Sequence, residues 1–320
     1  MLLTPEIITI LTLDFIFLFF GFIAFFISIN IVKKWNLSST SQVQYKLEKQ
    51  SFLVATIIKY IFIIKLPLFL FFIFTADKLS DIITGAMCAA GVVSSVSLST
   101  PMFFFKILNL YIFGFWLILH HYDLKNEHQP YTRYKFLLYI FGFFLLVAEI
   151  YLEISFFTSL DVSKLVSCCG TIFSATSTSS ISWIFSIDKI YFIYAFYISF
   201  AFLVLSYILK NAIAIFLSNA TYIVISIISL IMFFGTYIYQ LPTHHCPFCM
   251  LQKDYDYIGY VLYISLYAGT FFGISGAIMS KLENSVQSFY YKMSMISNTI
   301  YAFIISAYPI VYFLKHGVWL

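Results

Sequence analysis

Long apolar runs recur along the chain and are separated by short polar stretches. A helix needs about 20 apolar residues to cross roughly 30 Å of hydrocarbon, whereas the strands of a membrane barrel show short alternating segments. The pattern therefore predicts an all-α polytopic membrane protein with eight transmembrane helices. The predicted spans cover residues 8–32, 52–75, 102–121, 136–158, 190–210, 220–241, 257–280 and 294–314.

The composition agrees with this pattern. Hydrophobic residues make up 62% of the 320 residues and charged residues 10%, against about 25% charged in soluble domains. We therefore interpret residues 1–320 as a single helical membrane domain that contacts membrane lipid. The net charge of +4 comes without a basic cluster interleaved with aromatic residues, so we expect no nucleic-acid partner. The first apolar run lacks the features of a secretory signal, and we interpret it as the first span.

The distribution of Lys and Arg predicts the orientation, because short cytoplasmic loops retain these residues. Ten of them fall on one side of the predicted spans and six, including Lys106, on the other. Both termini should then be exoplasmic, and we expect the inner membrane of a bacterium. The outer segments 76–101, 161–189 and 242–256 carry all five cysteines, which would face the periplasm or exterior. Disulfides are permitted in that oxidising compartment.

The sequence THHCPFCMLQKDYDYIGY, residues 243–260, carries the densest group of reactive side chains. It places His244, His245, Cys246 and Cys249 just before the seventh predicted span. Two cysteines with this spacing at a helix N-terminus can face the same small volume, and the helix dipole stabilises a thiolate there. A redox pair is one interpretation of this arrangement.

The run from Cys246 to Lys253, CPFCMLQK, resembles the CPLCxxQR pattern of the disulfide bond formation protein B family, a family of quinone-linked membrane proteins. Proteins of that family oxidise a cysteine pair with a bound quinone and pass the disulfide to a soluble partner. The resemblance implies that Cys246 and Cys249 are the redox pair, that Lys253 lies near a quinone, and that a periplasmic thiol protein is the partner. This chain differs from the family in its eight predicted spans, in lacking cysteine after Cys249, and in having Lys where the family has Arg.

Under this hypothesis the chain is a membrane thiol-disulfide oxidoreductase that passes electrons between exoplasmic thiols and a membrane carrier. In this scheme Cys246 attacks a disulfide or accepts electrons, and Cys249 resolves the resulting mixed disulfide. Lys253 orients the electron acceptor. Cys168 or Cys169 relays electrons to the partner.

Two other functions remain open at this point. Thiolates and imidazoles also suit Cu(I) or Zn, so the outer segments could bind or transport a soft metal received from a metallochaperone. The candidate ligands are His244, His245, Cys246, Cys249 and Cys88, with Met87 beside them. The chain could instead be a membrane subunit that docks a partner enzyme or ATPase, with the cysteines forming structural disulfides.

Several charged residues fall within the predicted spans, where charge is costly and faces a partner or a water-filled path. Lys65 and Glu149 lie at about the same depth, roughly 20 Å from the inner ends of their spans, and should pair. Glu153 lies one turn beyond Glu149 on the same face. This group is either a structural ion pair or part of a proton or cation path. Asp14 and Lys59 should lie closer to the membrane surfaces and reach toward water.

Overall fold

The computed structural model describes residues 4–36, 41–126, 128–161, 166, 184, 186–282 and 287–320. Over these ranges every regular element is a helix, which confirms the all-α prediction. Cys168 and Cys169 lie outside the described residues.

Eight helices are long and apolar enough to cross a membrane, as predicted. Most extend beyond the predicted apolar runs, because their polar ends continue the helix. The second helix begins at Gln42, ten residues before the predicted start, where the side chain of Ser41 accepts a hydrogen bond from the Gln44 amide. The helices are α1 (Pro5–Lys34), α2 (Gln42–Ser80), α4 (Ser99–Lys125), α5 (Thr132–Ser159), α7 (Lys189–Ile208), α8 (Ala212–Ser229), α10 (Ile258–Met279) and α11 (Gln287–His316). The exoplasmic position of the termini and of the cysteine segments stays a prediction.

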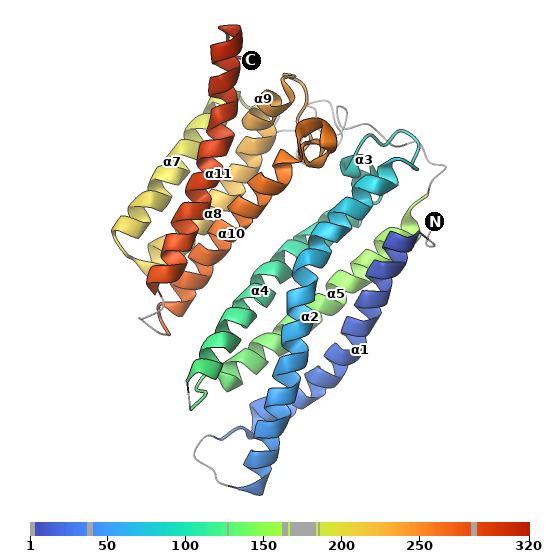
Figure 1. Ribbon diagram of the computed structural model, residues 1–320, viewed down its shortest axis with the longest axis vertical. Coiled ribbons are helices and arrows are strands. Elements are labelled where there is room, and N and C mark those ends of the chain that lie inside the picture. The colour runs from blue at the N-terminus through green and yellow to red at the C-terminus, as the bar shows by residue number, and fades with distance from the viewer. Residues whose placement is uncertain are drawn as a thin grey trace. The chain divides into compact units, whose positions relative to one another are not determined.

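The chain divides into two compact units, and the first comprises Met1–Thr84 and Val92–Lys164. In this first unit α1 packs against α2 and α5, and α4 packs against the same two helices, so the four form a closed bundle (Figure 1). Aromatic side chains fill part of its core: the rings of Phe62 and Phe113 stack with centroids 4.0 Å apart, and Trp116 meets Phe62 edge-on.

The second unit comprises Gly85–Gly91 and Leu165–Leu320. Its helix α8 continues through a π-helical turn, Leu230–Phe234, into the short helix α9 (Gly235–Tyr239). Helix α10 packs against α8 and α11, and α7 packs against α8 and α11 (Figure 1). The short helix α3 (Ala89–Ser94) follows α2 in the sequence and begins within the Gly85–Gly91 segment of the second unit.

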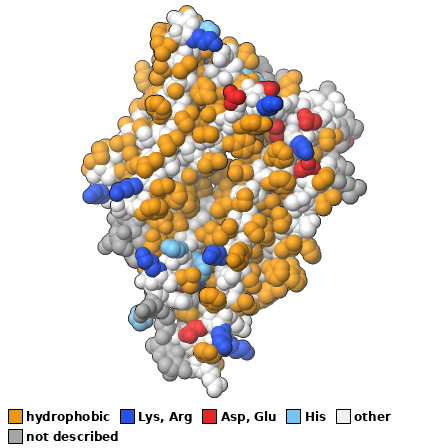
Figure 2. Space-filling view, viewed as in Figure 1, with side chains coloured by type: hydrophobic (Ala, Val, Ile, Leu, Met, Phe, Trp, Pro, Cys, Tyr) orange, Lys and Arg blue, Asp and Glu red, His pale blue; other side chains and the backbone are white. Residues whose placement is uncertain are grey.

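Large apolar side chains cover the outside of the helices. Figure 2 shows hydrophobic side chains over most of the visible face, with few charged ones among them. Phe15 and Phe303, on α1 and α11, are 70% and 76% exposed. Such a surface is unfavourable in water and suits contact with lipid, so these helices belong in a membrane.

Polar side chains in the second unit turn inward and bond to one another. Asn219 on α8 donates to the Tyr207 hydroxyl at 3.0 Å, and Ser294 on α11 donates to the Gly269 carbonyl at 2.5 Å. Asn298 donates to Asn219 at 3.3 Å. Since lipid offers no hydrogen-bond partners, groups of this kind are stable only when the helices satisfy them internally.

Close helix packing around this polar cluster depends on glycine, and Gly273→Ala tests it. A Cβ atom at Gly273 would overlap the buried side chain of Asn219, which is fixed by its hydrogen bonds. We expect the substitution to lower the free energy of unfolding by about 1–3 kcal/mol. Chemical unfolding of the full-length protein in mixed detergent micelles measures this.

Gly142→Ala is the matched control, because a Cβ there would lie 3.4 Å from its nearest neighbour, an ordinary contact. Alanine is also the better helix former, so that variant should be at least as stable as wild type. Equal effects at the two glycines would contradict the packing described here.

Candidate functional site

The motif predicted to carry chemistry lies in the segment that joins α9 to α10. Gln240, with a left-handed backbone (φ 54°), ends α9. Two 3-10 turns follow, Cys249–Leu251 and Lys253–Tyr255. Asp256 and Tyr257 are also left-handed, with φ of 52° and 55°, and α10 begins only after them.

The cysteine pair precedes the seventh span, as predicted, but it lies too far from α10 for the predicted dipole effect. Ile258, the first residue of α10, comes nine residues after Cys249. The left-handed conformations of Asp256 and Tyr257 interrupt the backbone hydrogen bonding that would extend α10 toward the cysteines. The dipole of α10 thus acts on other residues, because its effect is confined to the first turn.

Three cysteines converge within the second unit. The Sγ atoms of Cys88, Cys246 and Cys249 all lie within 4.8 Å of one another. The Sγ atoms of Cys88 and Cys246 are 3.5 Å apart, longer than the roughly 2.05 Å of a disulfide bond. All three side chains are buried, with exposed fractions of 0%, 1% and 5% in chain order. Cys88, from the Gly85–Gly91 segment, thus meets two cysteines that follow it by more than 150 positions.

Two tyrosines hold the loop that carries Cys246 and Cys249. The hydroxyl of Tyr239 donates to the Cys246 carbonyl and accepts the Met250 amide at 3.1 Å. The hydroxyl of Tyr263, on α10, donates to the Pro247 carbonyl at 2.7 Å. These bonds satisfy irregular backbone that would otherwise be buried without partners, so the tyrosines fix the position of the cysteines. The sequence motif gave no sign of either tyrosine's role.

A side chain from the loop between α9 and α10 forms a hydrogen bond to the segment that contains Cys88. The Nε2 of Gln252 donates to the Met87 carbonyl at 3.2 Å. The Met87 side chain itself points away and is 70% exposed. The Phe248 amide donates a hydrogen bond to the sulfur of Cys246 at 3.4 Å. Such a bond stabilises negative charge on that sulfur.

The start of α10 packs tightly against the turn that begins at Cys249. A Cβ atom at Gly259 would come within 2.6 Å of Met250 Cγ and 2.9 Å of Leu251 Cδ2. The absence of a side chain at Gly259 therefore lets the turn that begins at Cys249 lie directly against α10.

The two histidines flank the sulfur atoms. The Nδ1 of His245 lies 2.8 Å from the Ile231 carbonyl, in the π-helical turn, and the ring of His244 packs edge-on against Tyr239 at 4.3 Å. Burial lowers the pKa of both imidazoles below the ordinary value, while the nearby Cys88 thiol opposes that shift at His244. Among the described residues neither imidazole joins the group of three sulfur atoms. Lys253, in the second 3-10 turn, is exposed.

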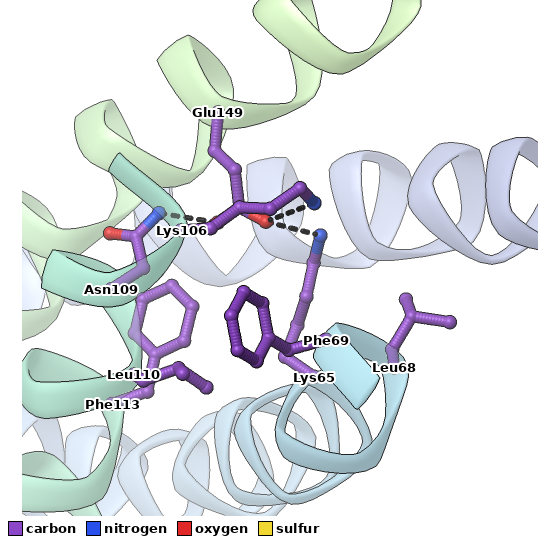
Figure 3. Close-up of a pocket in the computed structure, with 8 residues that line it drawn as sticks. All are labelled: Lys65, Leu68, Phe69, Lys106, Asn109, Leu110, Phe113 and Glu149. Atoms are coloured by element: carbon purple, nitrogen blue, oxygen red, sulfur yellow. Dashed lines mark hydrogen bonds and ion pairs between the residues drawn. The ribbon is translucent and has the colours of Figure 1, made fainter. Parts of the chain in front are cut away.

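The first unit contains a second group of buried functional side chains. Figure 3 shows Lys65 from α2 and Lys106 from α4 converging on Glu149 from α5, each with Nζ 3.2 Å from Oε1. The predicted pairing of Lys65 with Glu149 is confirmed. Lys106 also lies 2.6 Å from Glu153 Oε2, and Lys65 lies 2.7 Å from Asp14 Oδ1.

Two expectations about these charges are wrong. Asp14 does not reach toward water, since it is 1% exposed and pairs with Lys65 across the bundle. Lys106, counted with the lysines outside the membrane, is buried in α4 between two carboxylates. Both errors arose because each residue was judged by its position along one helix, whereas its partner comes from another. Lys59 is exposed, as expected.

Comparison with models of known protein families gave no match, and comparisons with curated proteins and with solved structures gave none either. The class of protein that the structure defines is a helical membrane protein with a buried three-cysteine site. Its chemistry has to be inferred from the geometry of that site.

Chemical cross-linking tests the meeting of the two cysteine segments. In a chain carrying Cys168→Ser, Cys169→Ser and Cys249→Ser, we expect dibromobimane to join Cys88 to Cys246, because their sulfur atoms are 3.5 Å apart. Fluorescence of the doubly alkylated product, with peptide mapping of the purified full-length protein, detects the link. The further substitution Cys88→Ser should abolish it. Single alkylation of both cysteines in the folded protein, without a link, would contradict the geometry.

Proposed function

We propose that this chain is a membrane protein that binds a soft metal ion through Cys88, Cys246 and Cys249, and that the ion is Cu(I) rather than Zn(II). The observation that carries the proposal is the convergence of three sulfur atoms within 4.8 Å. Two of them come from a single motif, and the third comes from a distant segment that Gln252 holds in place.

The spacing of the sulfur atoms suits one shared ion. With metal–sulfur bonds of about 2.3 Å, three sulfurs around an ion lie roughly 4 Å from each other. The observed range, from 3.5 Å to at most 4.8 Å, brackets that value.

The number and type of donors favour Cu(I). Soft thiolates select Cu(I), whereas structural Zn(II) takes four ligands in a tetrahedron. Within the part of the chain that the structure describes, the group consists of three thiols, with no imidazole or carboxylate in it. Three sulfur donors suit trigonal Cu(I), whereas tetrahedral Zn(II) would need a fourth ligand from outside this group.

Burial favours metal binding over exchange with a protein thiol. Cysteines that exchange disulfides with a partner are typically accessible to it, whereas Cys88, Cys246 and Cys249 are at most 5% exposed. A small ion can enter a site that a folded partner cannot reach. If the loop faces the periplasm, as the distribution of Lys and Arg predicts, a metallochaperone on that side would supply or accept the ion.

Thiol redox chemistry is the second candidate, supported by the CPFC motif and by the contact between Cys88 and Cys246. Oxidation of two of the thiols to a disulfide releases two electrons and two protons, which a quinone would take up to become a quinol. The third cysteine could then attack the disulfide and move it within the group. In that scheme Lys253 would orient the quinone, as the resemblance to the disulfide bond formation protein B family implies.

Metal binding by the purified protein tests the proposal. We expect the full-length protein, reduced and loaded anaerobically with Cu(I), to retain one ion per chain in competition with a Cu(I) chelator. Each of Cys88→Ser, Cys246→Ser and Cys249→Ser should weaken Cu(I) binding by at least about tenfold, since each removes a direct ligand. Elemental analysis and chelator competition measure the stoichiometry and the affinity.

The double variant Cys168→Ser, Cys169→Ser is the matched control and should bind Cu(I) like wild type. Retention of Cu(I) by the three single variants at wild-type affinity would contradict the proposal. If wild type binds no metal, and Cys249→Ser instead accumulates a mixed disulfide in cells, the redox candidate replaces it.

A further inference from the structure

The charged side chains buried in the first unit do not balance. Asp14, Glu149 and Glu153 contribute three carboxyl groups, and Lys65 and Lys106 contribute two ammonium groups. All five residues are between 1% and 5% exposed. With every group ionised, the cluster would carry a net charge of −1 in the middle of a helical bundle.

The surroundings make that net charge unfavourable. The ammonium of Lys106 lies 4.4 Å from the centre of the Phe72 ring, and that of Lys65 lies 5.7 Å from the Phe17 ring. Burial of an uncompensated charge among apolar groups is far more costly than burial of a balanced set. One more positive charge is therefore required at this site.

The hydrogen bonds indicate where that charge belongs. Both oxygens of Glu149 are occupied, Oε1 by the two lysines and Oε2 by the Asn109 amide at 2.5 Å. Asp14 Oδ2 and Glu153 Oε1 are buried and have no hydrogen-bond partner among the described residues. Both carboxyl groups belong to one cluster, because Asp14 bonds Lys65 and Glu153 bonds Lys106, and both lysines contact Glu149.

The charged groups facing this site come from all four helices of the bundle: Asp14 from α1, Lys65 from α2, Lys106 from α4, and Glu149 and Glu153 from α5. The other buried ion pair described in the first unit, Asp123 with Lys135, is separate. It lies more than about 20 Å away along α4 and α5 at 1.5 Å per residue.

We propose that this cluster is a proton-binding site that holds one exchangeable proton between Asp14 and Glu153. The proton makes the cluster neutral and resides on one of the two carboxyl groups that have an oxygen without a partner. Glu149 stays ionised, because two lysines and Asn109 all donate to it.

The space at the site favours a proton over a metal cation. Beside the site is a cavity that is lined by Lys65, Lys106 and Glu149 and by neither Asp14 nor Glu153; its volume is about 10 Å³, at the lower limit for one water molecule (Figure 3). Two ammonium groups on its wall repel a cation, and a metal ion would need several oxygen ligands around it.

Loss of the proton would matter for the whole bundle. It would leave a net negative charge where α1, α2, α4 and α5 meet, and the lysines would have to redistribute among three carboxylates. The proton site therefore lies where a change of charge can alter the packing of all four helices. It is independent of the cysteine site, which belongs to the second unit.

Infrared spectroscopy of the full-length protein in detergent tests the charge count. At neutral pH the wild type should show the carbonyl stretch of one buried protonated carboxyl, and the band should shift in D₂O because the proton exchanges. Both Asp14→Asn and Glu153→Gln should abolish this band, since either substitution leaves two carboxylates balanced by two lysines. These two variants nearly preserve side-chain shape, so a failure of one to fold leaves the other as the test.

Removal of a positive charge should have the opposite effect. Lys106→Met should produce a second carboxyl band of similar intensity, because a second proton must then be bound. Asp123→Asn, at the separate ion pair, is the control and should leave the wild-type band unchanged. If the wild type lacks any band that Asp14→Asn or Glu153→Gln removes, the cluster is fully ionised and the proposal is overturned. Loss of the wild-type band on addition of sodium chloride would equally overturn it, by showing that a metal cation takes the site.

Discussion

The absence of water inside a bilayer is the constraint on which this structure depends. Lipid cannot satisfy a buried charge, amide or hydroxyl, so each such group must find its partner within the helices. In the first unit Lys65 and Lys106 are held by carboxylates from α1 and α5. In the second unit Asn219 and Ser294 satisfy one another and the backbone near Gly269. The two units thus meet the same constraint with different chemistry.

The cysteine site lies between two membrane spans, and its buried backbone also needs partners within the protein. Between α9 and α10 the backbone leaves the helical conformation, and buried irregular backbone is tolerated only where protein groups bond to it. The hydroxyls of Tyr239 and Tyr263 supply those bonds, and as a consequence they hold the loop in one conformation. A fixed loop keeps Cys246 and Cys249 beside Cys88.

Features that depend on local sequence were predictable, whereas features that depend on helix packing, apart from the pairing of Lys65 with Glu149, were predictable only in part. Apolar runs predicted the eight spans, and the two-residue gap between Cys246 and Cys249 predicted that their sulfurs lie close together. The arrival of Cys88 depends on packing between segments 158 positions apart, for which the sequence carries no local signal. The burial of Asp14 likewise depends on a lysine from another helix. The helix-dipole argument failed because α10 begins nine residues after Cys249, too far for an effect that is confined to the first turn.

X-ray absorption spectroscopy of the Cu(I)-loaded full-length protein tests the central claim most directly, because it counts the atoms bound to the ion. The account predicts a first shell of three sulfur atoms at about 2.3 Å, with no nitrogen or oxygen ligand. A shell containing histidine nitrogen, or fewer than three sulfurs, would show that Cys88, Cys246 and Cys249 do not act as one site and would contradict the account.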